Sequence, residues 1–463
     1  MRKKQHPKKF HLFEAVLSVI CVVLITEAAA PVAAIGTSQL FWQIFLMIGF
    51  LVPFGLITSE LGTTYPGEGG IYDWVVRAYG HKWGARVSWC YWINFPIWMA
   101  SLATMFPKII TMATGVTIDI FGSMVIELAF VWIVTVIAFT PVCDNIFLLK
   151  ITAVVKVSLA LLIGGLGIYG AMKHGMATRY TLKSLLPTFD LKSLSFISVI
   201  IFNYLGFEVI CTMIDDMQEP NKQIPRAIIL GGLVIAGIYI FSAFGISAAI
   251  PVGKISASSG LIDAVQIMTG HKTSILILIV SALFLFTLFG NMVSWSMGVN
   301  RMAAYAADRK DMPALFAQRG KYNIPTGAVG MNGIVASFLI LIAPMIPNKD
   351  MFWSFFSLNL ILCLLSYLPV FPAFIKLRKI DSKIERPFKV RGNDFLLKVT
   401  AYVPMTLLCI ALFFLAVPTD LKRETLISTL PVTSGAILAV ILGEIVILYM
   451  KSKEQKEEVR QKS

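Results

Sequence analysis

The chain has 463 residues, of which 57% are hydrophobic and only 14% are charged, and its mean hydropathy is +0.77. Soluble domains are about 45–50% apolar and about 25% charged, so this composition excludes an ordinary soluble protein. The formal net charge is +14, but no soluble basic domain is present to carry it, and we expect no nucleic-acid partner.

Twelve apolar stretches follow one another along the chain. Each is close to the ~20 residues that a helix needs to cross ~30 Å of hydrocarbon. They must be helical, because lipid offers backbone groups no hydrogen-bond partner. The sequence therefore predicts an all-α polytopic membrane protein in contact with the lipid bilayer. The predicted spans are Leu12–Ile35, Leu40–Ser59, Ala85–Ile110, Ile120–Thr140, Leu148–Met172, Leu194–Ile214, Ala227–Ile250, Ser274–Ala307, Gly327–Ile346, Phe352–Leu377, Val399–Val417 and Leu430–Tyr449.

The basic residues indicate the orientation of these spans. Lys and Arg are concentrated before the first span, after the tenth span and in the last fourteen residues, 450–463. Because cytoplasmic loops carry an excess of Lys and Arg, we expect both termini in the cytoplasm and a multi-pass protein of the cell membrane. Residues 1–11 would then be a cytoplasmic segment, 12–449 the membrane domain, and 450–463 a charged tail.

The first span contains an acid, a proline and a glycine within ten residues, Glu27, Pro31 and Gly36. Proline removes a helical hydrogen bond and clashes with the carbonyl four residues earlier, so a break in the helix is expected here. A simple proline kink would also explain Pro31 alone. The nearby Glu27 favours a functional break, because unwound backbone at membrane depth is tolerated only beside protein or a watery cavity.

The sixth span carries a second candidate break, Phe202-Asn203-Tyr204-Leu205-Gly206-Phe207-Glu208. Asn203, Gly206 and Glu208 are unusual so close together in a membrane helix. The alternative is a packing glycine beside a buried Glu208 whose hydrogen bonds are satisfied. Breaks in spans one and six fit two inverted five-helix repeats, about 12–172 and 194–377, with two extra helices at about 399–449. A binding site would then lie between the breaks, near the membrane midplane.

Three charged residues lie deepest in the predicted spans: Glu27, Lys156 and Glu208. Each needs a reason, because a charge at the bilayer centre costs ~2.5–3.5 kcal/mol on insertion scales. Two interpretations of Glu27 are open: it forms a buried structural ion pair with Lys156, or it binds a cationic substrate. Lys156 is the structural partner of Glu27, a proton site, or the substitute for a bound sodium ion. Glu60 lies near a span end, where we expect its side chain to reach water.

Several aromatic residues accompany the breaks, namely Tyr91, Phe202, Tyr204, Phe207 and Trp295. Most aromatics in membrane helices pack or line the interface, but ring faces beside the breaks are also suited to cation–π contact with a substrate. The histidines have no metal-ligand spacing, and there is no nucleophile–base constellation. We therefore expect no metal site, no cofactor and no enzymatic activity.

Three loop segments resemble those of the amino acid–polyamine–organocation transporter superfamily: Thr58–Gly80, Gly206–Ile228 and Ala303–Phe316. The resemblance covers nearly the whole chain and implies the LeuT-like fold. Amino acid carriers of the superfamily usually have a Gly-Ser-Gly-like stretch in the first helix, which holds the substrate carboxylate. Here that place reads Ala29-Ala30-Pro31-Val32-Ala33, preceded by Glu27. Polyamine carriers place a glutamate in this segment, so the resemblance implies a substrate with amines and no carboxylate, bound beside Glu27 and Ala30.

Four further positions match the arginine–agmatine exchangers and their sodium-independent relatives. Phe202 matches their aromatic gate, Glu208 their acid after the sixth-helix glycine, and Trp295 the tryptophan that stacks on a guanidinium group. Lys156 matches the lysine that occupies the sodium position. The pattern is most similar to bacterial agmatine–putrescine antiporters. The resemblance thus implies a transporter for a small cationic diamine, working by alternating access. The alternative is an amino acid exchanger or proton symporter of the same superfamily; the sequence leaves the oligomeric state open.

Overall fold

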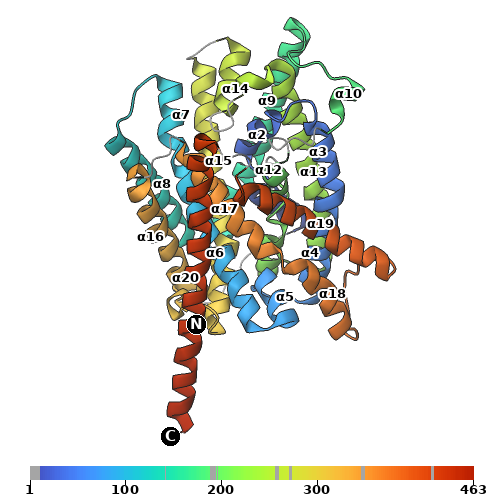
Figure 1. Ribbon diagram of the computed structural model, residues 1–463, viewed down its shortest axis with the longest axis vertical. Coiled ribbons are helices and arrows are strands. Elements are labelled where there is room, and N and C mark those ends of the chain that lie inside the picture. Colours follow the sequence, from blue (N-terminus) through green and yellow to red (C-terminus); the bar gives the residue numbers. More distant parts are fainter. Residues whose placement is uncertain are drawn as a thin grey trace, which may run out of the picture.

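The computed structural model describes residues 11–140, 142–187, 194, 197–255, 260–270, 274–345, 350–418 and 422–462. These residues form helices and no β-strand, and the long helices run roughly side by side in one bundle (Figure 1). The predicted all-α architecture is confirmed. The helices are α1 (Leu12–Val23), α2 (Ala29–Ala33), α3 (Gln39–Leu46), α4 (Val52–Thr64), α5 (Gly70–Tyr79), α6 (His81–Ala103), α7 (Met105–Thr114), α8 (Ile120–Ala138), α9 (Val142–His174), α10 (Leu182–Leu185), α12 (Ile197–Phe202), α13 (Pro220–Ala249), α14 (Gly260–Thr269), α15 (Ile275–Asp308), α16 (Thr326–Ile342), α17 (Met351–Tyr367), α18 (Val370–Ile380), α19 (Asp394–Ala416) and α20 (Arg423–Lys462).

Within the described part of the chain, 11 helical segments are long and apolar enough to cross a membrane. The remaining predicted span, the first, is divided. Its α1 has only 12 residues, or about 18 Å at ~1.5 Å per residue, and a 3₁₀ turn at Thr26–Ala28 separates it from the short α2. The twelve predicted spans therefore correspond to eleven long segments and the divided first span, and one of the long segments, Ile197–Ile214, is also interrupted, between α12 and the 3₁₀ segment Phe207–Asp216.

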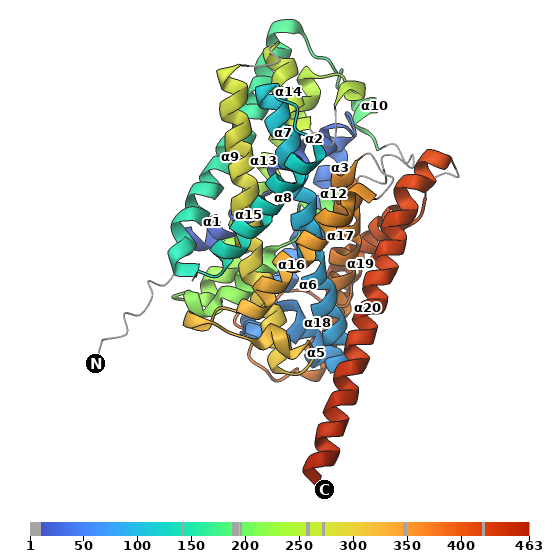
Figure 2. The same cartoon turned by 90° about the vertical axis from the view of Figure 1, so that its left-hand side faces the viewer.

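The two broken spans lie in the interior of the bundle. Helix α1 packs against α9, α13 and α15, and against the 3₁₀ segment Phe207–Asp216 that follows α12. Every residue of the apolar window Ile197–Ile214 is buried, whereas only 22% of the window in α20 is buried. The last two helices, α19 and α20, carry many exposed apolar side chains, and Figure 2 shows α20 standing along one side of the molecule. The broken spans therefore lie deeper in the bundle than α19 and α20.

One end of the bundle carries α5, the start of α6 and the end of α18, and we call this end the α5 face (Figure 2). Helix α20 extends beyond it. At this face Glu60, at the end of α4, is fully buried. It accepts hydrogen bonds from Arg378 Nε (2.8 Å), Arg386 Nη1 (3.1 Å) and the backbone N–H of Val390 (2.7 Å). The expectation that Glu60 reaches water is therefore wrong: two arginines compensate its charge inside the protein.

Candidate functional site

The first helix break is an extended backbone segment at Leu24 and Ile25, with φ/ψ of −73/114 and −113/106. The backbone groups released there are bound by one side chain from α13. The Ile25 N–H donates to Tyr239 Oη at 2.7 Å, and the Tyr239 hydroxyl donates to the Val23 carbonyl at 3.1 Å. Because Tyr239 is buried, it replaces the water that would otherwise hold an unwound backbone.

This break begins slightly earlier than the sequence predicts. Glu27 lies in the 3₁₀ turn just after the extended residues, while Ala30 and Pro31 lie buried inside α2. Pro31 is the third residue of α2, where the N–H groups have no partner within the helix, so its missing N–H costs no intrahelical bond. Gly36 has φ of +92°, a left-handed conformation that favours glycine, and it ends this segment. Pro31 is thus a neighbour of the break rather than its cause.

The second break falls within the stretch that the sequence singles out. Helix α12 ends at Phe202, Asn203 and Tyr204 form a turn, and Gly206 has φ of +101°. A Cβ atom on Gly206 would lie 2.8 Å from Trp295 Cζ2 and 3.2 Å from Val22 Cγ1. Both the backbone conformation and the space therefore require glycine at this position. The second break thus lies directly against the last turn of α1.

Glu208 follows the second break and is almost completely buried. Its Oε1 atom accepts hydrogen bonds from the Tyr91 hydroxyl at 2.6 Å and from the Tyr367 hydroxyl at 2.5 Å. Its Oε2 atom has no partner among the described residues. The alternative of a fully satisfied structural glutamate therefore holds for one carboxylate oxygen and not for the other.

Glu27 is also buried, and its Oε1 atom has no hydrogen-bond partner in the described structure. No ion pair joins Glu27 to Lys156. The Lys156 ammonium instead donates to the Cys21 carbonyl at 2.6 Å and to Asn291 Oδ1 at 2.7 Å. The buried ion pair offered by the sequence is therefore wrong. A carboxylate oxygen without a partner, placed beside unwound backbone, can receive a cation.

Lys156 connects three helices through these two bonds. It projects from α9 to the last turn of α1 and to α15, and it is 1% exposed. A carbonyl oxygen and an amide oxygen are also the kinds of ligand that hold a sodium ion in carriers with broken helices. The ammonium group thus occupies oxygen ligands that such an ion would use.

Aromatic side chains fill the space beside the two breaks. The Trp295 indole donates to the Val22 carbonyl at 2.8 Å, and its ring lies 5.3 Å from Trp98 and 6.2 Å from Tyr91. Phe202 lies 5.2 Å from the Trp98 ring, edge to face. All of these rings are at most 2% exposed. These rings are therefore packed in the interior of the bundle, beside the two breaks.

The remaining predicted site residues lie at the edge of this centre. The Tyr204 hydroxyl donates to the Gln43 carbonyl at 3.4 Å, and its ring lies 6.3 Å from that of Tyr239. Asn203 is buried, and its Oδ1 atom has no partner among the described atoms. Sequence reasoning missed Tyr239 and Tyr367. Their only signal is a hydroxyl group in an apolar span, which does not tell which distant backbone or side chain it binds.

A buried central site lined by broken helices, inside an all-helical membrane bundle, is the arrangement of a secondary transporter. Comparison with known proteins agrees. The chain belongs to the amino acid permease family, whose family model matches residues 10–443. The expected superfamily is thereby confirmed, and the chain is a membrane transport protein rather than an enzyme.

Individual relatives cover almost the whole chain. A probable agmatine/putrescine antiporter of Lactococcus lactis is 58% identical over 441 residues, which are 95% of each chain. A glutamate/gamma-aminobutyrate antiporter of the same species is 23% identical, over 90% of this chain and 86% of the relative. A polyamine transporter of Arabidopsis thaliana is 22% identical, over 93% of this chain and 85% of the relative.

Proposed function

We propose that the protein exchanges small cationic diamines, such as agmatine or putrescine, across the cell membrane. The observation that carries this proposal is the pair of buried carboxylates, Glu27 and Glu208, one beside each helix break and each with an oxygen that lacks a partner. Two separate anionic sites suit a substrate with a positive charge at each end. The similarity to a probable agmatine/putrescine antiporter supports the same substrate class.

In this proposal each end of the substrate has its own partner. Glu27 neutralises one cationic group, next to Ala30 and the unwound residues of the first span. Glu208 neutralises the other, with Oε1 held by Tyr91 so that Oε2 faces the substrate. The rings of Trp295 and Phe202 enclose the substrate and offer π faces to its charge. A substrate carboxylate would lie near two glutamates, so repulsion excludes ordinary amino acids.

Transport then follows from opening the buried centre to one face at a time. The breaks at Asn203–Gly206 and at Leu24–Ile25 are the points where half-helices can tilt without breaking helical hydrogen bonds. The two inverted repeats, about 12–172 and 194–377, would supply the symmetry of this motion, with α19 and α20 outside it. By the positive-inside rule the α5 face and both termini lie in the cytoplasm.

Lys156 sets the driving force in this proposal. A fixed ammonium that already binds the Cys21 carbonyl and Asn291 leaves no need for a sodium ion there. Equimolar exchange requires nothing more than this permanent charge. If the ammonium instead loses and regains its proton during the cycle, the protein would also couple uptake to protons.

The test is uptake into proteoliposomes of labelled putrescine and labelled agmatine, with a panel of amino acids as competitors. Glu27→Gln should lower diamine affinity about ten- to hundredfold, because a charge-assisted bond contributes ~1.5–3 kcal/mol. Glu127→Gln is the matched control, since Glu127 is an acid of the same kind in α8, away from both breaks. Free amino acids that compete as well as diamines would instead support the amino acid exchanger.

A further inference from the structure

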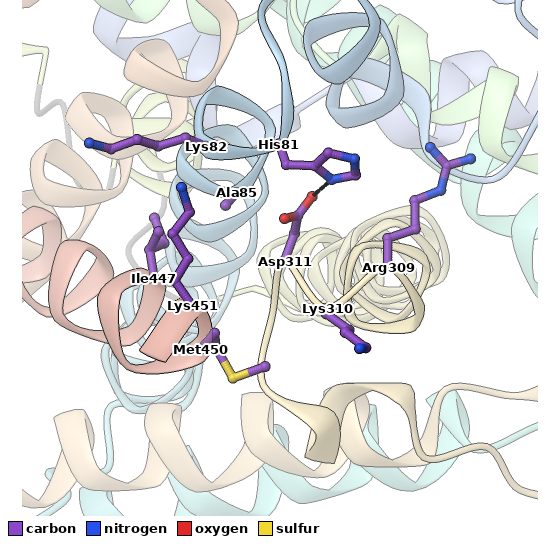
Figure 3. A pocket seen from close by; sticks show the side chains of 9 residues that line it. All are labelled: His81, Lys82, Ala85, Arg309, Lys310, Asp311, Ile447, Met450 and Lys451. Carbon is purple, nitrogen blue, oxygen red and sulfur yellow. Dashed lines mark hydrogen bonds and ion pairs between the residues drawn. The ribbon is translucent and has the colours of Figure 1, made fainter. Parts of the chain in front are cut away.

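A pocket of about 290 Å³ opens on the α5 face, well away from the central site. It lies between the start of α6, the residues that follow α15, and α20 near the end of its membrane span. Figure 3 shows the side chains that line it. They are His81, Lys82, Ala85, Arg309, Lys310, Asp311, Ile447, Met450 and Lys451.

The lining carries an excess of positive charge. Four lysine and arginine side chains line the pocket, and Arg309 is already paired with Asp73 on α5 at 2.7 Å. The one acid in the lining, Asp311, already accepts hydrogen bonds from the Tyr72 hydroxyl (2.6 Å) and from His81 Nδ1 (2.7 Å). Lys82 and Lys451 make no hydrogen bond or ion pair with the described residues. They come from two different helices, α6 and α20. The pocket therefore presents two lysines without a hydrogen-bonded partner, which an anionic group can bring together.

The pocket lies at the boundary of the hydrocarbon region. The apolar segment that contains α6 begins at His81 and Lys82, and the apolar run of α20 ends at Met450, directly before Lys451. Leu448 and Tyr449 on α20 are 59% and 66% exposed, and Trp83 on α6 is 46% exposed. Exposed apolar and aromatic side chains beside lysines mark the depth of lipid headgroups. An anion bound in this pocket would therefore sit at the level of the lipid phosphates.

An apolar groove adjoins the pocket on the membrane side. It has a volume of about 510 Å³, lies between α6, α17 and α20, and is lined by side chains that include Val87, Leu365 and Val440. Ile447 lines both the groove and the basic pocket. Neither Arg86 nor Glu444, which also line the groove, adds net charge, because they pair with each other at 2.5 Å. A charged pocket at headgroup level and an apolar groove next to it match the two parts of a phospholipid.

We propose that this pocket binds the phosphate group of an anionic phospholipid, with Lys82 and Lys451 as its principal contacts and an acyl chain along the adjoining groove. The bound lipid joins α20 to α6 and to the residues after α15. Arg309 also bonds Asp73 on α5 at 2.7 Å, so the lipid would lie against a contact between α5 and the residues after α15. Lipid binding should therefore stabilise the protein against unfolding.

The test uses the purified full-length protein in detergent, titrated with phosphatidylglycerol or with phosphatidylcholine of the same chain length. Bound lipid is counted by native mass spectrometry, and the thermal midpoint is measured in parallel. The double variant Lys82→Gln/Lys451→Gln should bind phosphatidylglycerol about 25-fold more weakly, since each lysine near an anionic lipid contributes about fivefold. The control double variant, Lys383→Gln/Lys389→Gln, removes the same charge from exposed positions after α18.

Three outcomes decide the proposal. Selective retention of phosphatidylglycerol by the wild type and the control, with loss in the Lys82/Lys451 variant, supports it. Equal binding by all three proteins, or equal binding of both lipids, overturns it. A third arm adds 10 mM inorganic phosphate: if phosphate alone raises the thermal midpoint through these lysines and displaces the lipid, the pocket is a site for free phosphate and the lipid assignment is wrong.

Discussion

Tyr239→Phe is the most direct test of how the first helix break is held. The substitution keeps the ring and its packing against Tyr204 but removes the hydroxyl that binds both the Ile25 N–H and the Val23 carbonyl. Ile25 is 1% exposed, so water does not reach the released N–H group. The variant therefore changes the backbone of the break without adding bulk or charge.

The size of the effect follows from the two lost bonds. A buried donor or acceptor left without a partner costs about 1–3 kcal/mol, so the two groups together cost about 2–6 kcal/mol. The unfolded chain carries no such penalty, because water binds the same groups there. If only ~2 kcal/mol of this falls on the conformation that binds substrate, affinity should decrease about thirtyfold.

Two measurements separate this effect from general damage. The diamine dissociation constant is measured by scintillation proximity in detergent, and the thermal midpoint by nanoscale fluorimetry. Tyr402→Phe is the control, because Tyr402 on α19 is 45% exposed and its hydroxyl makes no bond to the described residues. Unchanged affinity and midpoint in Tyr239→Phe would refute the view that this hydroxyl holds the unwound segment.

Three further variants test the other contacts. Trp295→Leu should weaken diamine binding up to about thirtyfold, because cation–π contact in a site without water contributes ~2 kcal/mol. The control Trp132→Leu, at an exposed position of α8, should leave diamine binding unchanged. Equal effects of the two substitutions would mean that Trp295 only packs against its neighbours. Lys156→Met should slow exchange without creating a pH dependence if the ammonium is a permanent charge at this position. Loss of proton-driven uptake, with equimolar exchange preserved, would instead indicate that Lys156 couples transport to protons. A strict sodium requirement of the wild-type protein would contradict both interpretations of Lys156. Glu60→Gln should destabilise the protein by about 3–5 kcal/mol in urea or thermal unfolding, because two partly buried arginines lose the fully buried carboxylate that pairs with them. A shift below 1 kcal/mol would contradict that role.

The spans and the second break could be predicted from the sequence because the membrane restricts what a chain can do. Any apolar stretch of sufficient length must be helical, so the spans follow from composition alone. Asn203 and Gly206 in such a stretch are costly unless the helix opens, and the structure places the turn and the positive φ of Gly206 there. The first break was harder to place. The sequence predicts the break near Pro31, because proline disrupts helices. The extended residues are instead Leu24 and Ile25, and their side chains give no signal because they are ordinary in a helical apolar span.

The partners of buried polar groups were not predictable in the same way. Glu60 pairs with Arg378 and Arg386, which are more than 300 residues away in the chain, and its position near a span end suggested water instead. Glu208 shares its Oε1 atom between tyrosines of α6 and α17. Such pairs depend on which helices pack together and in which rotation. A single sequence shows that a buried polar group requires a hydrogen-bond or charge partner, but it does not show which residue is that partner.

The last turn of α1 shows how these long-range bonds serve transport. The final carbonyl groups of a helix have no partner within it, and a break exposes them in the membrane interior. Here three successive carbonyls each receive a side-chain donor from a different helix. The pairs are Cys21 with Lys156 of α9, Val22 with Trp295 of α15, and Val23 with Tyr239 of α13. Because these donors belong to three separate helices, any tilt of α9, α13 or α15 during alternating access must stretch a bond to the same turn. We infer that the end of α1 is where movements of the bundle reach the substrate site. A cation at the negative end of the helix dipole strengthens that connection, which is why the charge of Lys156, rather than its size alone, is expected to matter for exchange.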